Sequence, residues 1–145
     1  MFKDRSDAGR KLAEALQSYE HEDVLVLAVP RGGVEVGYEV AKGLEADFSV
    51  LITRKLPFPD NPESGFGAIA EDGSTFIYER HARMMPQATV DRIKEEQRQE
   101  IERRIQALRG GRPLPPIEGR TVIVVDDGVA MGSTMRASLM LCRNT

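Results

Sequence analysis

The sequence predicts an α/β fold in which a doubly wound, mostly parallel sheet carries helices on both faces. Three segments rich in aliphatic residues, 24–29, 48–53 and 121–125, are typical of buried strands. The first is followed by a short glycine turn and a segment of helical periodicity that leads to the second. A strand, a helix and a strand joined in this way form a βαβ unit, which implies parallel pairing and a right-handed crossover.

The first helix is predicted to begin at Ser6, whose hydroxyl can cap it, because apolar residues recur beyond it with helical spacing. After Gly32 and Gly33 a second helical stripe begins, and Gly43 stands where that helix can end. The strand at 48–53 then completes the βαβ unit.

Residues 54–67 contain three prolines and two glycines. So many residues that interrupt regular structure predict a long loop, and a loop of this length in a compact domain is usually either a functional lid or disordered. Two short strands are expected on either side of the turn at 71–73, with 75–78 the better candidate for pairing.

The strongest helical pattern covers about 89–108, with one apolar stripe and a densely charged opposite side. Glu100 and Arg104 are four residues apart and are spaced to pair. The pattern favours a long surface helix over a coiled coil, because two glycines end it. A proline-rich connector then leads to the strand at 121–125, and a last helix is predicted from Thr134.

The composition indicates one soluble domain, residues 1–145. The net charge is −3, which does not favour a nucleic-acid partner. No segment approaches the roughly 18 apolar residues of a membrane span, and no secretion signal is visible. The single cysteine, Cys142, excludes an intrachain disulfide, so a cytoplasmic location is expected. His21 and His81 lack partners at catalytic or metal spacing and are expected at the surface.

Three loops are expected to meet at the carboxyl ends of the strands, where ligands bind in open parallel sheets. They are 30–33 (PRGG), 53–55 (TRK) and 126–134 (DDGVAMGST). The first lacks the G-x-G-x-x-G spacing of a dinucleotide site. The first two supply Arg31, Arg54 and Lys55 together with glycine amides, which suits phosphates, and the third supplies carboxylates and small hydroxyl residues. A ligand with a diol between two phosphate groups would satisfy all three.

These segments resemble the motifs of the type I phosphoribosyltransferases. VIVVDDGVAMGST, residues 122–134, resembles their motif for phosphoribosyl pyrophosphate (PRPP), and VPRGGVEVGYEVA, residues 29–41, resembles their pyrophosphate loop. Residues 54–73 are similar to the segment that opens the flexible lid in a branch of small, mostly uncharacterised phosphoribosyltransferases. The resemblance runs along essentially the whole chain and implies a type I phosphoribosyltransferase-like fold.

The resemblance implies a role for the residues of each motif. Asp126 and Asp127 would accept hydrogen bonds from the ribose 2- and 3-hydroxyls, and Lys55 would reach the pyrophosphate from the lid; these three are the expected catalytic residues. The implied PRPP-binding residues are Arg31, Gly32 and Gly33 for the pyrophosphate, together with Asp126, Asp127, Gly128, Val129, Ala130, Met131, Gly132, Ser133 and Thr134, of which 130–134 would cradle the 5-phosphate.

The expected cofactor is Mg²⁺, a hard cation that prefers a few carboxylates together with substrate oxygens. It would relieve the repulsion between Asp126 and Asp127, binding them directly or through substrate or water. The expected activity is the transfer of the phosphoribosyl group of PRPP to a nucleobase or another acceptor, with release of pyrophosphate. A lid over 54–67 would shield the oxocarbenium-like state from water.

Two departures from the family pattern leave an alternative open. Met131 replaces a threonine, so one hydrogen bond to a charged phosphate, worth about 1.5–3 kcal/mol, is missing. The chain ends at Thr145, where the family pattern continues into another strand, so the sheet is expected to be short of its last strand. Either the chain is truncated or a homo-oligomer completes the sheet. The alternative is a non-catalytic regulatory module that senses PRPP or a nucleotide.

Overall fold

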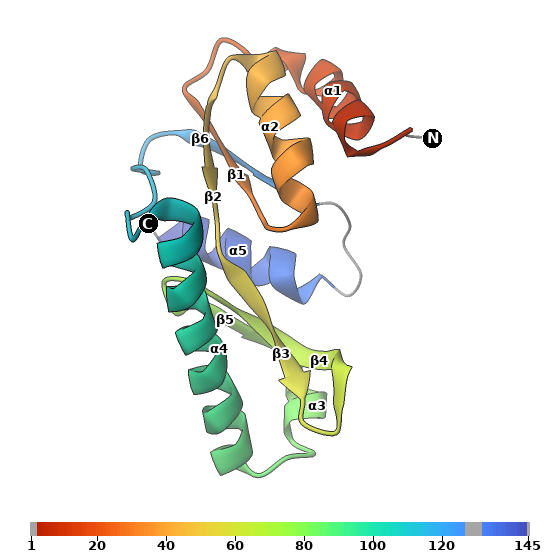
Figure 1. Cartoon of the computed structure of the whole chain (residues 1–145), viewed down its shortest axis with the longest axis vertical. Coiled ribbons are helices and arrows are strands. Elements are labelled where there is room, and N and C mark those ends of the chain that lie inside the picture. The colour runs from red at the N-terminus through yellow and green to blue at the C-terminus, as the bar shows by residue number, and fades with distance from the viewer. Residues whose placement is uncertain (1–2, 127–131, 145) are drawn as a thin grey trace. The chain divides into compact units, whose positions relative to one another are not determined.

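The computed structural model describes residues 3–126 and 132–144 (Figure 1). The described chain divides into two compact units. Unit 1 contains residues 3–51 and 113–126, and unit 2 contains residues 52–112 and 132–144. Each unit is described by itself.

Unit 1 is built on a parallel sheet with the strand order β2-β1-β6. Its elements are α1 (Arg5–Ala15), the 3₁₀ helix η1 (Gln17–Tyr19), β1 (Val24–Ala28), α2 (Gly32–Leu44), β2 (Asp47–Val50) and β6 (Thr121–Val125). Both neighbouring pairs of strands run parallel, as the βαβ pattern predicts. The predicted α/β fold with a parallel sheet is confirmed.

The core of unit 1 lies between β1 and α2. All five residues of β1 are buried, and Val36, Val40 and Leu44 form the buried stripe of α2. Each such side chain contributes roughly 1.5–3 kcal/mol when it is fully buried. Gly37 allows the close approach of helix and strand, because a Cβ atom there would lie 2.8 Å from the Cβ atom of Ala28.

The ends of the first two helices differ from the prediction. Asp4, not Ser6, caps α1, since its Oδ1 accepts from the Asp7 N–H at 2.8 Å, while the Ser6 hydroxyl donates to Glu35. Helix α2 continues past Gly43 to Leu44 and ends with Glu45 in the left-handed region. Gly43 serves packing instead, because a Cβ atom there would lie 2.5 Å from the Cβ atom of Ala13.

Unit 2 contains an antiparallel sheet with the order β3-β4-β5 and three helices. Its elements are β3 (Thr53–Phe58), β4 (Asn61–Ala70), β5 (Thr75–Ile77), α3 (Glu79–Ala82), α4 (Gln87–Arg109) and α5 (Ser133–Asn144). Strands β4 and β5 meet at the predicted turn, and α4 contains the predicted segment 89–108. The predicted strand 48–53 is found only in part, because β2 ends at Val50 and Thr53 begins the second sheet.

The prediction that 54–67 is an irregular loop is wrong, because this segment lies in the hairpin of β3 and β4. The pairing register shifts on either side of Pro57, and prolines are tolerated at such bulges and in edge strands such as β3. Leu56 and Phe66 are fully buried and hold the hairpin in the core. Packing across the two strands thus stabilises the hairpin despite its prolines and glycines.

His81 is also placed differently from the prediction. It lies in α3 and is half-buried, and its ring packs at centroid distances of 6.0 Å from Phe58 and 5.9 Å from Tyr78. Its Nδ1 atom is buried without a hydrogen-bond partner among the described residues. His21 lies at the surface, as expected, with 91% of its side chain exposed.

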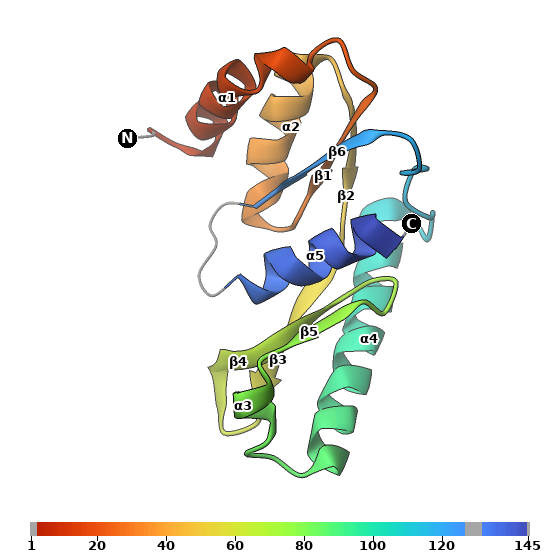
Figure 2. The same cartoon turned by 180° about the vertical axis from the view of Figure 1, so that it is seen from behind.

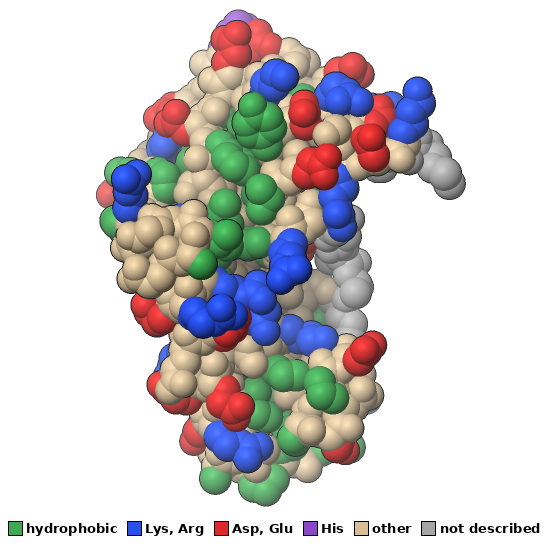
Figure 3. Space-filling model, in the orientation of Figure 1, with side chains coloured by type: hydrophobic (Ala, Val, Ile, Leu, Met, Phe, Trp, Pro, Cys, Tyr) green, Lys and Arg blue, Asp and Glu red, His purple; other side chains and the backbone are tan. Residues whose placement is uncertain are grey.

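Helices α4 and α5 cover opposite faces of the β3-β4-β5 sheet (Figure 2). Consecutive strand residues point to opposite faces. Thr53 shares a buried hydrogen bond of 2.9 Å with Ser138 of α5, whereas Arg54 donates to Gln97 of α4. Acidic and basic side chains lie side by side on the face of unit 2 that carries α4 (Figure 3), as the charged pattern of that helix predicts.

Candidate functional site

The candidate site in unit 1 lies at the carboxyl ends of β1 and β6. These strands are direct parallel neighbours, with Ala28 opposite Val125, so the chain leaves both at the same edge of the sheet. The Val29 N–H continues this pairing by donating to the Val125 carbonyl at 2.8 Å. The segment PRGG and the segment that begins at Asp126 therefore start side by side.

Gly33 brings the start of α2 against Asp126. A Cβ atom at Gly33 would lie 2.7 Å from the Val125 carbonyl oxygen and 3.0 Å from the Cα atom of Asp126. The atoms in the way belong to the backbone of β6 and its extension, so they cannot swing aside as a flexible side chain would. Only glycine fits here without a shift of the strand or the helix. The amino end of α2, with its positive partial charge, thus lies next to a carboxylate residue.

The two residues before Gly33 are accessible to solvent and so to a ligand. Arg31 directly precedes α2, is exposed, and makes no side-chain cap hydrogen bond to the helix. The Gly33 N–H donates to the Val29 carbonyl at 3.1 Å, so Gly33 contributes its small size rather than its amide. Gly32 is half-buried at the first position of α2, where N–H groups lack intrahelical acceptors.

The second motif is described only in part. Asp126 is half-buried at the end of the first described range, and Asp127, Gly128, Val129, Ala130 and Met131 lie outside the described residues. The last three predicted residues, Gly132, Ser133 and Thr134, belong to unit 2, at the start of α5.

The start of α5 has a defined geometry. Gly132 has φ +88°, in the left-handed region that favours glycine, and its carbonyl accepts from the Arg136 N–H at 2.8 Å. Ser133 and Thr134 are the first residues of the 12-residue helix. Small hydroxyl residues at a helix amino end are suited to binding a phosphate.

Lys55 lies in unit 2 on β3 and is exposed. Its Nζ atom donates to the Glu63 carbonyl oxygen at 2.8 Å, which ties the side chain across the hairpin. The structure therefore places it on a paired strand rather than in the irregular lid that the sequence predicts.

The described residues include no group of three or more His, Cys, Asp and Glu side chains arranged to hold a metal ion. Asp126 is the described half of the predicted Mg²⁺ pair. A half-buried carboxylate at the edge of the sheet fits Mg²⁺, which usually binds one or two carboxylates and takes its other ligands from water and substrate phosphates.

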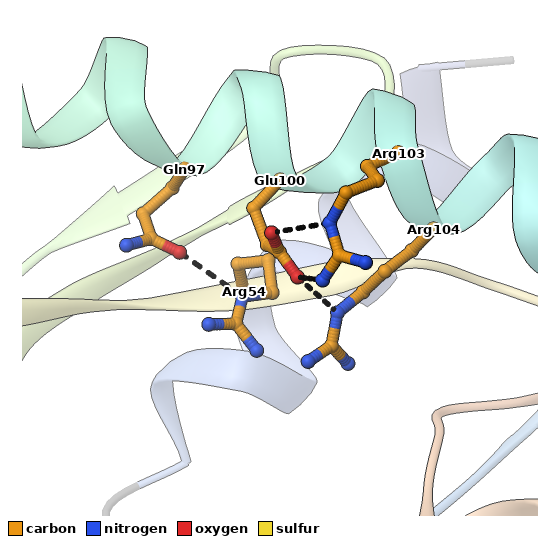
Figure 4. A network of polar contacts seen from close by, with 5 residues as sticks. All are labelled: Arg54, Gln97, Glu100, Arg103 and Arg104. Carbon is orange, nitrogen blue, oxygen red and sulfur yellow. Dashed lines mark hydrogen bonds and ion pairs between the residues drawn. The ribbon is translucent and has the colours of Figure 1, made fainter.

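Unit 2 contains a cluster of arginines that is not predicted from the sequence (Figure 4). Arg54 of β3 faces Gln97, Glu100, Arg103 and Arg104 of α4. The Glu100–Arg104 pair is the one that the spacing predicts. Arg54 was missed as its neighbour because a residue in a predicted loop has no defined facing direction, whereas one in a strand does.

Comparison with known proteins identifies the family. The phosphoribosyl transferase domain profile matches residues 4–145. The chain belongs to the phosphoribosyl transferase family. The predicted family membership is therefore confirmed.

Two curated relatives of this phosphoribosyl transferase domain come from Mycobacterium tuberculosis. "Putative phosphoribosyl transferase MT0597" of strain CDC 1551 and "Putative phosphoribosyl transferase Rv0571c" of strain H37Rv are each 43% identical to the chain over 145 residues. The match covers 99% of this chain and 33% of each relative, so the chain spans about a third of their length.

A solved structure has a similar fold. The crystal structure of TT1426 from Thermus thermophilus matches the phosphoribosyl transferase domain with a TM-score of 0.77 and 39% identity. The match covers 99% of this chain and 69% of that one. As to membranes, none of the helices in the described ranges is both long enough and apolar enough to span a bilayer.

Proposed function

We propose that this phosphoribosyl transferase domain transfers the phosphoribosyl group of PRPP to a nucleobase or another acceptor and releases pyrophosphate. The observation that carries the proposal is the packing of Gly33 against the backbone of Val125 and Asp126. It puts an anion-attracting helix end beside a carboxylate that can accept hydrogen bonds from sugar hydroxyls. PRPP offers both chemical groups on one molecule.

The charge changes of the reaction match these residues. The bond between the anomeric carbon and the pyrophosphate oxygen breaks, and a bond from that carbon to the acceptor forms. Negative charge grows on the leaving group, where Arg31 and the amino end of α2 stabilise it. Asp126 and Asp127 orient the ribose through its hydroxyls. Gly132, Ser133 and Thr134 hold the 5-phosphate together with the preceding residues of the motif.

Lys55 assists from the β3–β4 hairpin. In the structure its ammonium group is bound to the Glu63 carbonyl, a neutral acceptor. A phosphate oxygen is the stronger partner, because both groups are then charged. We infer that Lys55 can exchange this carbonyl for a phosphate oxygen, which is the role that the family resemblance implies for it.

Asp126 and Asp127 are the residues that would hold Mg²⁺, directly or through water and substrate. When bound, the cation neutralises charge on the pyrophosphate and so makes it a better leaving group. The carboxylates contribute by positioning the sugar.

The test is to mix the chain with PRPP, Mg²⁺ and a panel of purine and pyrimidine bases and to measure released pyrophosphate. We expect release that requires a particular base and is lost in Asp126→Asn. Arg98→Gln is the matched control, because Arg98 is an exposed residue of α4 paired with Glu95. Release that is unaffected by Asp126→Asn would contradict the proposal.

The second candidate function is a PRPP or nucleotide sensor. Met131 favours it, because a methionine provides no hydroxyl to the phosphate where the family has threonine. In that case PRPP would protect the chain against heat while no base causes release of pyrophosphate.

A further inference from the structure

Three arginines and one glutamate gather on the α4 face of the sheet in unit 2 (Figure 4). Arg54 comes from β3, and Glu100, Arg103 and Arg104 come from α4. Three positive charges thus surround a single negative one. This group, here called the arginine cluster, is assigned to no step of the proposed transfer reaction.

Both carboxylate oxygens of Glu100 accept hydrogen bonds from the two arginines of its own helix. Its Oε2 accepts from the Arg103 Nε at 3.0 Å, and its Oε1 accepts from the Arg104 Nε at 3.0 Å and also from the Arg103 Nη2. These hydrogen bonds, first from Arg103 and then from Arg104, lower the pKa of Glu100 to about 2. Glu100 therefore stays ionised, and its position orients the Arg104 guanidinium.

Arg54 has no carboxylate bonded to it within the described residues. Its Nε donates to the Gln97 Oε1 at 3.0 Å, a neutral partner, and its two Nη groups have no hydrogen-bond partner in the described ranges. Burial lowers the pKa of Arg54, and the nearby charge of Arg104 lowers it further. Glu100 acts in the opposite direction but bonds to Arg103 and Arg104 instead, so the charge of the half-buried Arg54 guanidinium is only partly compensated and an incoming anion would stabilise it.

The free ends of two guanidinium groups point the same way. Figure 4 shows the Nη atoms of Arg54 and Arg104 directed to the same side, away from the axis of α4. Arg104 uses its Nε for Glu100, which leaves its Nη groups for another partner, and 24% of its side chain is exposed. Arg103 lies at the solvent side with 71% exposed. Solvent thus has access to donors that are already oriented.

We propose that Arg54 and Arg104 form a binding site for a phosphoryl group, with Arg103 supporting it and with Gln97 and Glu100 as positioning residues. The planar guanidinium fork matches two phosphate oxygens at once, and two such forks match the charge of a phosphate dianion. The site does not rest on the proposed transfer reaction. Lys55 is the next residue along β3, and successive strand residues point to opposite faces, so the two cations serve different partners.

Calorimetric titration of the 145-residue chain with inorganic phosphate, at constant ionic strength, tests the proposal. We expect Arg54→Gln and Arg104→Gln each to weaken binding by about tenfold or more, because each removes charge-assisted hydrogen bonds. Arg98→Gln, on the same helix, should bind like the unchanged chain. Equal affinity in all four proteins, or no binding at millimolar phosphate, would overturn the site.

The Arg31→Gln variant separates this site from the one in unit 1. Phosphate binding that survives in Arg31→Gln and is lost in Arg104→Gln belongs to the arginine cluster, and the reverse pattern overturns the proposal. Titration with ribose 5-phosphate distinguishes sources of the phosphoryl group: tighter binding than phosphate, again lost in Arg104→Gln, assigns the site to a sugar phosphate, and equal binding assigns it to free phosphate.

A second readout guards against loss of folding. The Nε–Hε NMR signals of Arg54 and Arg104 should shift on addition of phosphate, while that of Arg98 should not. This measurement uses the unchanged chain, so it does not depend on any variant. Shifts confined to Arg98 and other exposed arginines would show nonspecific attraction and would contradict the site.

Discussion

Arg109 and Glu71 form a bidentate ion pair in which each side chain is only 8% exposed. The Nη1 and Nη2 atoms of Arg109 donate to the two carboxylate oxygens of Glu71 at 3.0 and 2.6 Å. Glu71 Oε2 also accepts from the Ile52 N–H at 2.8 Å. The pair thus joins the last residue of α4 to the β4–β5 turn and to the residue before β3.

Removing either partner of this pair should destabilise unit 2. Arg109→Ala leaves a buried carboxylate without its counter-ion, and Glu71→Ala leaves a buried guanidinium, so we expect each to cost about 3–5 kcal/mol. The double variant should cost clearly less than the sum of both, as measured by urea unfolding. Arg92→Ala is the control, because its pair with Glu96 is exposed and should be worth less than about 1 kcal/mol. Additive losses would show that the pair is not coupled.

Gly33→Ala should disturb the unit 1 site. The new methyl group would meet the Val125 carbonyl oxygen at 2.7 Å, so the strand or the helix must move. We expect a loss of about 1–3 kcal/mol in stability and a large loss of PRPP affinity. Gly37→Ala is the matched control on the same helix, since it crowds Ala28 in the core instead. Equal PRPP affinity in the two variants would argue against a special role of Gly33.

Glu100 should titrate far below its ordinary pKa. Its carboxyl pKa falls from 4.5 to about 2 because Arg103 and then Arg104 donate to the ionised form. A carboxyl pKa lowered by folding contributes stability that is fully present above about pH 4.5 and is lost as the pH falls through about 2. The Glu100 Cδ chemical shift, followed by NMR, should report this midpoint. Arg103→Gln should raise it, and a midpoint near 4.5 in the unchanged chain would contradict the hydrogen bonds.

Met131→Thr should tighten PRPP binding. Threonine restores a hydroxyl donor where the family pattern has one, and a hydrogen bond to a charged group is worth about 1.5–3 kcal/mol, or roughly tenfold or more in affinity. Calorimetry with PRPP and Mg²⁺ measures the change. Met131→Leu, which adds no donor, should leave the affinity unchanged. Unchanged or weaker binding in Met131→Thr would refute the assignment of this position to the phosphate.

The amino-acid sequence by itself determined the parallel unit and the family. Continuous apolar runs at 24–29 and 122–125 predict strands through local pattern alone, and both strands are found within a residue of the prediction. The motifs that follow these strands predict a site for phosphates and sugar hydroxyls, because the order of glycines and carboxylates can be recognised without coordinates. Parallel pairing then brings Gly33 and Asp126 to one edge.

The tertiary structure alone decided the hairpin, the ion pair and the arginine cluster. Residues 54–67 are predicted to be irregular because prolines and glycines disfavour regular structure locally. Burial of Leu56 and Phe66 in the paired strands stabilises the hairpin by more than these residues destabilise it. Once Arg54 lies in a strand, its facing direction is set, and it meets residues more than forty positions away on α4. Such contacts depend on distance in space rather than along the chain, and no local pattern in the sequence encodes that distance.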